Sequence, residues 1–449
     1  AGAGAVGYHI ASRLSSEDKQ VVVIDTDQRA VRQLSENLDV QTVTGSGSTP
    51  SALIEAGVKD ADIFLAVTDS DEINLVACMM TQLISPGTKK LARIRNADFD
   101  AFHHLFKTRN PQIDTIINPE VEVVNTIRKL MVVPEAVDVG TFIHGQVKYV
   151  GIHIDSESPM TDIKLMDLPS KFGDDRPLIA AIIRNNEVIV PGGKDTILVG
   201  DIIYFVCETR KLGAHLGTFG MGIQPIGNVL IIGGGRIGER LAISLEKDGI
   251  KTKIIESDRN RCRYLSAQLD KTIVLHGDGS DQTLFKDENL RPSDAVICVT
   301  NDDETNILVC LLAKSYGVNN TITRIGKSSY FPLLSNMGIQ KVVSPRLSAI
   351  SSILQEVRKG KVLSDISIFC EKGEFIEAIA IASSGIICRP IKQIKFPKGA
   401  LLVCIIREDQ IIIPTGESII KANDRVIIFT IKLAVKKLEK LLAVKIGFF

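Results

Sequence analysis

Two glycine-rich stretches decide the fold of this chain. Residues 2–7 read GAGAVG and residues 233–238 read GGGRIG, so the spacing Gly-x-Gly-x-x-Gly occurs twice, 231 positions apart. In the second copy an apolar run at 229–232 precedes the glycines, and an amphipathic segment follows them. This context is typical of the turn between a strand and a helix that receives the phosphates of a dinucleotide.

The repeat extends well beyond the glycines. An acid ends the next apolar run in both copies, 23 residues after the first glycine, as Asp25 and as Glu256. Further matches at the same offset or one residue more are residues 68–74 (TDSDEIN) with 300–306 (TNDDETN), Cys78 with Cys310, and Arg93 with Arg324. Residues 189–193 (IVPGG) also match 412–416 (IIPTG). The chain is therefore one two-domain unit that has been duplicated.

Each unit changes its hydrophobic pattern along its length. Short apolar, β-branched runs first alternate with amphipathic segments, which predicts a doubly wound parallel sheet. In the second unit we expect strands at 229–232, 253–255, 273–275 and 295–300, and helices at 236–247, 259–269 and 305–315. Near Val139 and Ile366 the pattern becomes one of short strands with turn signals. The predicted fold class is α/β: two doubly wound Rossmann-like parallel sheets, each followed by a small α+β module.

Composition excludes some classes of protein. Lys plus Arg and Asp plus Glu are both 53 in 449 residues, and this balance argues against a nucleic-acid partner. No stretch approaches the roughly 18 uninterrupted apolar residues of a membrane helix, so we expect no membrane span. The eight cysteines have no metal-ligand spacing. Because Cys78, Cys298 and Cys310 lie in apolar runs, they are interpreted as small buried hydrophobic residues in a reducing compartment.

The residue types of the two glycine motifs suit a nucleotide. The first glycine permits a tight turn, the second lets backbone N–H groups approach a pyrophosphate, and the third brings helix and strand together. A carboxylate at Asp25 or Glu256 accepts bonds from ribose hydroxyls and repels a 2′-phosphate, which favours NAD over NADP. Arg236 stands where the first unit has Ala5. Its guanidinium either reaches a further phosphate, which would let the second site accept ATP or ADP, or is a solvated residue at the start of a helix.

Other duplicated residues are predicted at the carboxyl ends of the strands. Thr68-Asp69 and Thr300-Asn301 follow a strand beside the expected crevice, and Arg93 and Arg324 end the next one. We expect these residues to line a ligand or to hold a loop. The acids that follow, Asp71-Glu72 and Asp303-Glu304, are better explained by the first turn of a helix, where they complement its dipole.

Machinery for catalysis is not evident. Of the seven histidines only His276 lies at a duplicated position, where the first unit has Thr44, and no nucleophile or metal-protease motif occurs. We expect the chain to bind a nucleotide without turning it over, with no catalytic and no metal-binding residue. The basic amphipathic tail at 432–445 either touches a membrane surface or, as we favour, packs on its own domain.

The duplicated order of these motifs, with residues 92–94 (ARI), resembles the TrkA family of Trk-type regulators over essentially the whole chain. The resemblance implies RCK-N (KTN) domains at 1–131 and 228–360, RCK-C domains at 132–212 and 361–449, and a linker at 213–227. It implies a cytoplasmic homo-oligomer, a tetrameric gating ring, at the inner face of the cell membrane beneath a potassium-translocating subunit. NAD(H) would bind at both sites, and ATP or ADP at the second. The implied site residues are Gly2, Ala3, Gly4, Ala5, Val6, Asp25, Thr68, Asp69 and Arg93, and then Gly233, Gly234, Gly235, Arg236, Ile237, Glu256, Thr300, Asn301 and Arg324.

One feature departs from the family, and two rival functions stay open. Family members carry a strand before the first glycine, so either the sequence begins one strand late, as we favour, or the first sheet lacks its central strand. An NAD-dependent oxidoreductase with two fused cofactor domains is the alternative function. A nucleotide-binding scaffold without a channel is a third.

Overall fold

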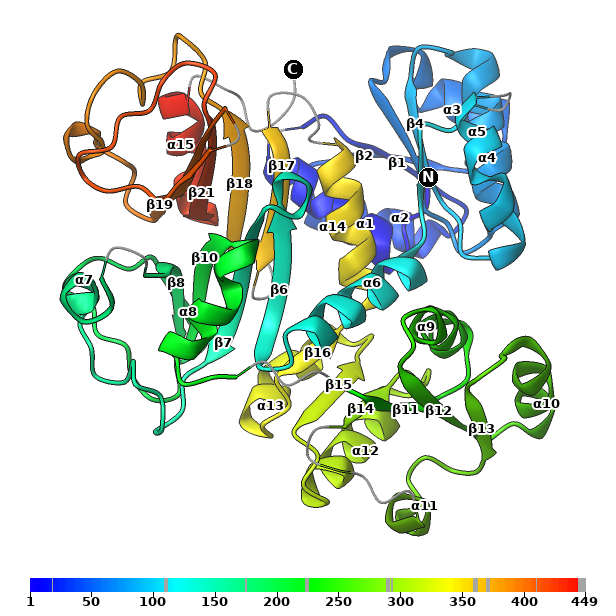
Figure 1. Cartoon of the computed structure of the whole chain (residues 1–449). Coiled ribbons are helices and arrows are strands. Elements are labelled where there is room, and N and C mark those ends of the chain that lie inside the picture. The colour runs from blue at the N-terminus through cyan, green and yellow to red at the C-terminus, as the bar shows by residue number, and fades with distance from the viewer. Residues whose placement is uncertain are drawn as a thin grey trace. The chain divides into compact units, whose positions relative to one another are not determined.

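The chain folds into two compact units. The structure is a computed structural model that describes residues 1–17, 19–108, 112–173, 176–222, 226–287, 291, 294–357, 362–368, 372–408 and 410–442 (Figure 1). The first unit takes its described residues from 1–123 and 344–357, and the second takes its own from 124–343 and 362–442. No helix among the described residues is long and apolar enough to cross a membrane.

The first unit holds the first glycine-rich turn in an interrupted α/β sheet. Its strands form two parallel pieces, β1-β2 and β3-β4-β5. The elements are α1 (Ala5–Ser16), β1 (Val22–Asp25), α2 (Gln28–Asn37), β2 (Gln41–Thr44), α3 (Pro50–Glu55), β3 (Ile63–Ala66), α4 (Asp71–Ile84), β4 (Lys89–Arg93), α5 (His103–Thr108) and β5 (Thr115–Ile117). Helix α6 (Pro119–Val132) begins here and ends in the second unit.

A helix from much later in the chain completes the first unit. Helix α14 (Pro345–Val357) lies beside α1, yellow against blue in Figure 1. Its Ile350 and Ile353 are buried in one hydrophobic cluster with Ile10 and Leu14 of α1. Glu356 adds polar contacts, because its carboxylate accepts a hydrogen bond of 3.0 Å from the Thr115 hydroxyl.

The second unit contains an uninterrupted parallel sheet with strand order β13-β12-β11-β14-β15-β16. The order reverses between β11 and β14, which is where a doubly wound sheet has its binding crevice. This arrangement confirms the predicted fold class. The elements are β11 (Asn228–Ile232), α9 (Arg236–Lys247), β12 (Lys251–Glu256), α10 (Arg259–Gln268), β13 (Ile273–His276), α11 (Gln282–Asp287), β14 (Ala295–Cys298), α12 (Asp303–Ser315), β15 (Asn320–Arg324), α13 (Phe331–Asn336) and β16 (Lys341–Val343).

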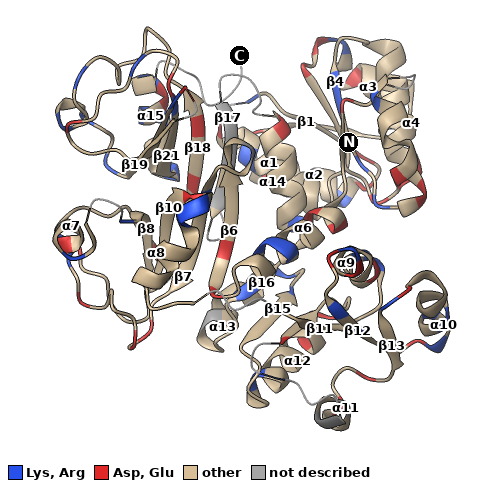
Figure 2. Cartoon of the chain, in the orientation of Figure 1, with Lys and Arg blue, Asp and Glu red and all other residues tan. Residues whose placement is uncertain are grey.

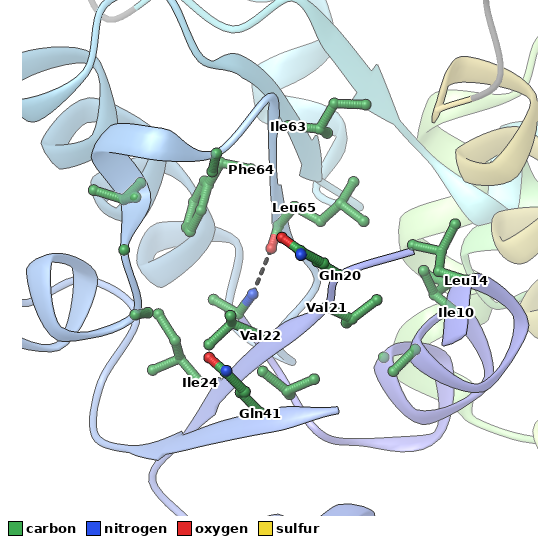
Figure 3. A pocket seen from close by; sticks show the side chains of 18 of the residues that line it. Ile10, Leu14, Gln20, Val21, Val22, Ile24, Gln41, Ile63, Phe64 and Leu65 are labelled. Atoms are coloured by element: carbon green, nitrogen blue, oxygen red, sulfur yellow. Dashed lines mark hydrogen bonds between the residues drawn. The ribbon is translucent and has the colours of Figure 1, made fainter. Parts of the chain in front are cut away.

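The two sheets differ at the position of β11. In the first unit only residues 1 and 2 occupy the corresponding place: Gly2 N–H donates to the Ile24 carbonyl at 2.8 Å, and Val67 N–H donates to the Ala1 carbonyl at 2.9 Å. Beyond them, β1 and β3 are separated by a cavity of about 430 Å³. Figure 3 shows Val22 and Ile24 of β1 on one side of it and Ile63 and Leu65 of β3 on the other.

Two small modules of the same topology belong to the second unit. Their antiparallel sheets have the orders β6-β7-β10-β8-β9 and β17-β18-β21-β19-β20, and they share a core in which Tyr149 stacks on Phe375 with ring centroids 5.1 Å apart. The first has β6 (Ala136–Phe142), β7 (Val147–His153), α7 (Leu168–Phe172), β8 (Leu178–Arg184), β9 (Glu187–Ile189), β10 (Ile202–Glu208) and α8 (Leu212–Thr218). The second has β17 (Val362–Ile368), β18 (Gly373–Ile379), β19 (Ala400–Arg407), β20 (Gln410–Ile412), β21 (Arg425–Ile431) and α15 (Val435–Leu442).

Two segments have sequence interpretations that the structure can test: the expected linker at 213–227 and the basic tail at 432–445. The glycine-rich stretch at 213–227 begins as helix α8 rather than as linker, because Leu212, Leu216 and Phe219 recur at helical spacing and are buried in the first module. The basic tail forms α15, whose Leu438 and Leu442 are buried in the core of the second module. The tail therefore packs on its own domain up to residue 442, as expected. Its last residues lie outside the described part of the chain.

Candidate nucleotide-binding sites

Both glycine-rich turns have the same backbone geometry. Gly2 has φ +107° and Gly233 has φ +103°, a conformation that side chains rarely adopt. A methyl group on the third glycine, Gly7 or Gly238, would overlap the carbonyl oxygen of the first. On the second glycine, Gly4 or Gly235, it would meet nothing within 4 Å. The turn is therefore closed on its inner side and open above its second glycine.

The helices that leave these turns begin without a side-chain cap. Gly4 and Gly235 are the N-cap residues of α1 and α9, and neither has a side chain to accept the first N–H groups. By contrast, side chains of the N-cap residues Asp27, Ser70, Asp258 and Asp302 accept such bonds at the starts of α2, α4, α10 and α12. N–H groups that no side chain caps, beside open space, form a place where a phosphate can bind.

A carboxylate is fixed beside each turn by the backbone. In the first unit, Asp25 at the end of β1 accepts the N–H of Ala3 at 2.5 Å and the N–H of Asp27 at 2.8 Å. In the second, Glu256 at the end of β12 accepts the N–H of Gly234 at 2.7 Å and the N–H of Asp258 at 2.8 Å. Each carboxylate keeps at least one oxygen with a further lone pair, so it can also accept a hydroxyl group.

The predicted Thr and Arg residues are brought together by an asparagine that the sequence analysis did not select. Asn74 Oδ1 accepts the backbone N–H of Thr68 at 3.0 Å and its hydroxyl at 2.7 Å, while Asn74 Nδ2 donates to the Arg93 carbonyl at 2.8 Å. Arg93 Nη2 in turn donates to the Thr68 carbonyl at 2.7 Å. Burial lowers the pKa of the Arg93 guanidinium.

The second unit repeats this network. Asn306 contacts the Thr300 N–H and hydroxyl at 3.0 and 2.8 Å and the Arg324 carbonyl at 3.0 Å, and Arg324 donates to the Thr300 carbonyl. Both asparagines are fully buried. The signal for them was present in the sequence, since each is the last residue of the duplicated stretches 68–74 and 300–306.

The acids at the start of α4 and α12 hold loops. Asp71 accepts the N–H groups of Arg95 and Asn96 at 2.9 and 2.8 Å, and Asp303 accepts those of Gly326 and Lys327 at 2.9 and 2.8 Å. Both lie in the first turn of a helix and are buried. This confirms the structural interpretation of these two acids and adds a role in shaping the loop after the next strand.

The neighbouring glutamates are exposed. Glu304 accepts hydrogen bonds of 2.7 Å from Lys327 and 2.6 Å from Tyr330, and these bonds lower its pKa to about 2. In the first unit, Glu72 accepts a 2.8 Å bond from the Ser70 hydroxyl instead. The mouth of the second site therefore carries a charged cluster that differs from the first.

The remaining predicted residues lie at the rim of their turns. Asp69 and Asn301 are exposed in the turns after β3 and β14, and the Asp69 carbonyl accepts a hydrogen bond from Arg95. Ala5 and Arg236 are exposed at the first position of α1 and α9, and Val6 and Ile237 behind them are buried.

Groups that could carry other chemistry are few in the described part of the chain. No group of three or more His, Cys, Asp or Glu residues there is arranged to hold a metal ion. His276 ends β13 next to Glu256 of β12, and its Nε2 lies 3.1 Å from the Ser257 carbonyl. Lys and Arg are interspersed with Asp and Glu over the ribbon in Figure 2.

Fold and site together define a class of protein: a chain with two Rossmann-type domains, each with the glycine-rich turn typical of nucleotide-binding domains. The model of the TrkA-N domain matches residues 1–119 and 229–345, and the model of the TrkA-C domain matches 149–214 and 376–443. Trk system potassium uptake protein TrkA of Azorhizobium caulinodans is 35% identical over 452 residues, covering 100% of this chain and 99% of that protein. TrkA of Halomonas elongata is 34% identical with the same coverage. The chain therefore belongs to the TrkA family of the Trk potassium uptake system.

Solved structures share the fold over nearly the whole length. The GsuK RCK domain superposes with a TM-score of 0.58 at 17% identity, covering 98% of this chain and 93% of that one. The GsuK channel bound to NAD gives a TM-score of 0.57 at 17% identity, covering 98% of this chain and 77% of that one. Both Rossmann-type halves and both modules thus follow the RCK architecture.

Proposed function

We propose that this chain is the nucleotide-binding regulatory subunit of a potassium uptake system. The observation that carries the proposal is the open space above Gly4 and Gly235, at uncapped helix N-termini and beside the fixed carboxylates of Asp25 and Glu256. The same three features recur in both halves. Membership of the TrkA family supplies the transport context.

We propose RCK-N domains at 1–131 and 228–360 and RCK-C domains from 132 and from 361, following the repeat in the sequence. Helix α14, which lies within 228–360, packs on α1 of the first unit. Because α8 packs in the first module, that module extends to about residue 222, which leaves a shorter linker than composition indicated.

NAD(H) is the proposed ligand of both sites, with ATP or ADP as a further ligand of the second. The backbone N–H groups of the turns would bind the phosphates, and the carboxylates would accept ribose hydroxyls. Arg236 lies exposed at the start of α9, where a further phosphate would meet its guanidinium. The GsuK channel bound to NAD, a solved structure that shares this fold, supports this choice of ligand.

The proposed assembly is a tetrameric ring of this chain at the cytoplasmic face of the membrane, under a Trk-type potassium-translocating subunit. Nucleotide binding would favour one state of the ring, and the coupling between nucleotide and channel is reciprocal. The proposal includes no nucleic-acid partner.

A binding role rather than an enzymatic one fits the polar groups around the sites. Asp25 and Glu256 are engaged by backbone N–H groups, and the Thr, Asn and Arg residues hold one another. An oxidoreductase would need a proton donor beside the nicotinamide. Sustained nicotinamide turnover with a metabolite, measured by absorbance, would favour the rival enzyme.

The test of the proposal is potassium flux through the reconstituted uptake system with NADH or ATP. We expect Asp25→Ala to lose the NADH response of the first site and Arg236→Ala to lose mainly the ATP response. Arg263→Ala removes an exposed charge from α10 and serves as the matched control. Identical nucleotide responses in wild type, Asp25→Ala and Arg236→Ala would refute the proposal.

A further inference from the structure

The second glycine-rich turn has a contact to which no sequence motif pointed. Arg261, in the first turn of α10, donates from Nε to the Gly234 carbonyl at 2.7 Å. Its Nη2 continues to Glu239 of α9 at 2.6 Å, and its Cζ lies 4.7 Å from the centre of the Tyr264 ring. Because Glu256 holds Gly234 by its N–H, this glycine is fixed at both its amide and its carbonyl group.

The guanidinium is well placed to act as a clamp. It joins the turn, α9 and α10 through one planar group, and its two bonds use two different nitrogens. The side chains of Arg261 and Glu239 are only 28% and 17% exposed, so water competes weakly for these bonds. Hydrogen bonds to charged groups are the strong ones in such a setting.

The first site cannot form this clamp. The residues at the positions of Arg261, Glu239 and Tyr264 are Ala30, Tyr8 and Gln33. The nearby arginines of α2 do not replace it, because Arg29 is exposed and Arg32 pairs with Glu36 of the same helix at 2.8 Å.

The sequences of the two turns explain why the second one needs a clamp. The first turn has Ala3 between its glycines, whereas the second has three consecutive glycines. Glycine loses more conformational freedom on ordering than any other residue. An alanine at position 234 would require the end of the Leu265 side chain to move, because its methyl would overlap Leu265 Cδ1 and lie 3.1 Å from Glu256 Oε2.

We infer that Arg261 is a positioning residue of the second site: it holds the triple-glycine turn in the conformation that receives the phosphates of a nucleotide. This inference rests on the proposed function. These bonds restrict the backbone of the second turn, as Ala3 restricts the first. The turn is therefore already ordered when the ligand binds, and binding loses less conformational entropy. The ligand it serves is a nucleoside diphosphate group, free or within a dinucleotide.

The test is NADH titration of the full chain, followed by nicotinamide fluorescence, with Asp25→Ala present in every variant to silence the first site. We expect Arg261→Ala to weaken NADH binding about ten-fold and Arg261→Lys about three-fold, since lysine keeps the charge without the planar fork. Arg263→Ala, which removes an exposed charge from the same helix, should bind NADH as its parent does.

A second readout separates positioning from a general loss of structure. Amide hydrogen exchange at residues 235–237 of the ligand-free chain should accelerate in Arg261→Ala and stay unchanged in Arg263→Ala. If Arg261→Ala fails to fold, Arg261→Lys carries the same test.

The outcomes distinguish this inference from the function on which it rests. Unchanged NADH binding in Arg261→Ala, or an equal loss in Arg263→Ala, would overturn the inference alone. Failure of the unmodified chain to bind NADH at all would overturn the proposed function as well.

Discussion

At the scale of single residues, the three glycines of each turn have different structural roles. The third has no room for a side chain, because a methyl there would enter the first glycine's carbonyl group, whereas the second faces open space. The spacing Gly-x-Gly-x-x-Gly indicates where the glycines are required, but not what each of them does. Only the surroundings of each one show which serves folding and which serves a ligand.

Substitution should separate these two roles. We expect Gly238→Ala to lower the free energy of unfolding by about 3 kcal/mol, since a backbone shift must relieve the overlap with Gly233. Gly235→Ala should leave unfolding unchanged and weaken nucleotide binding about ten-fold, because its methyl enters the space for the phosphates. Urea unfolding and NADH titration measure the two effects. Equal stability of both variants would contradict this division.

The polar residues of the sites show which contacts could be predicted from the sequence. Asp25 and Glu256 were predicted as ribose acceptors, and the structure adds that backbone N–H groups already fix them. Asn74 and Asn306 were part of the duplicated stretches but were not selected. Their role depends on a carbonyl group in the next strand, and no local pattern reveals that neighbour.

At the scale of elements, the described strands of the two Rossmann-type sheets differ at the position of β11. Strands β1 and β3 have a cavity of about 430 Å³ between them, where the second sheet has β11. Apolar side chains of both strands face it (Figure 3). A strand in this position would pair with both neighbours and bury those side chains.

A strand supplied to this cavity should stabilise the first unit. We expect joining the four residues Asn-Val-Leu-Ile, copied from 228–231, to Ala1 to raise the free energy of unfolding by about 3 kcal/mol. Thermal and urea unfolding measure the gain. The polar extension Asn-Ser-Gly-Ser is the control, since it offers backbone groups without apolar side chains. A gain of the same size from the control would show that the cavity does not select an apolar strand.

Helix and strand bounds were largely predictable because local signals set them. Helix α9 spans the expected residues, and β14 ends two residues earlier than expected because residues 299 and 300 already belong to the turn. Helix α12 begins earlier than expected because the Asp302 side chain caps it. Helix α8 was missed because its glycines outweighed three apolar residues whose partners lie in the first module.

At the scale of the whole molecule, the order of the chain does not match the order of its packing. Helix α14 follows the second Rossmann-type sheet in sequence but covers α1 in the first unit. The apolar face of α1, with Val6, Ile10 and Leu14, is buried by a segment more than 300 residues away.

A fragment experiment should reveal this dependence. We expect residues 1–133 alone to unfold without cooperativity, and the same fragment joined by a glycine-serine linker to residues 344–357 to unfold cooperatively. Calorimetry measures the difference. In the full chain, Ile353→Ala should cost about 3 kcal/mol of unfolding free energy, because it opens a cavity in the same cluster. A cooperative transition in the unlinked fragment would contradict the expectation.

The amino-acid sequence by itself determined the duplicated α/β architecture, the glycine-rich turns and the carboxylates one strand away. These features follow from short-range patterns of apolar, glycine and acidic residues, which a single sequence displays directly. Only the tertiary structure decided that α14 completes the first unit, that asparagines join Thr to Arg, and that Arg261 holds the second turn. Each of these depends on contacts between residues far apart in the chain, and folding alone selects such partners.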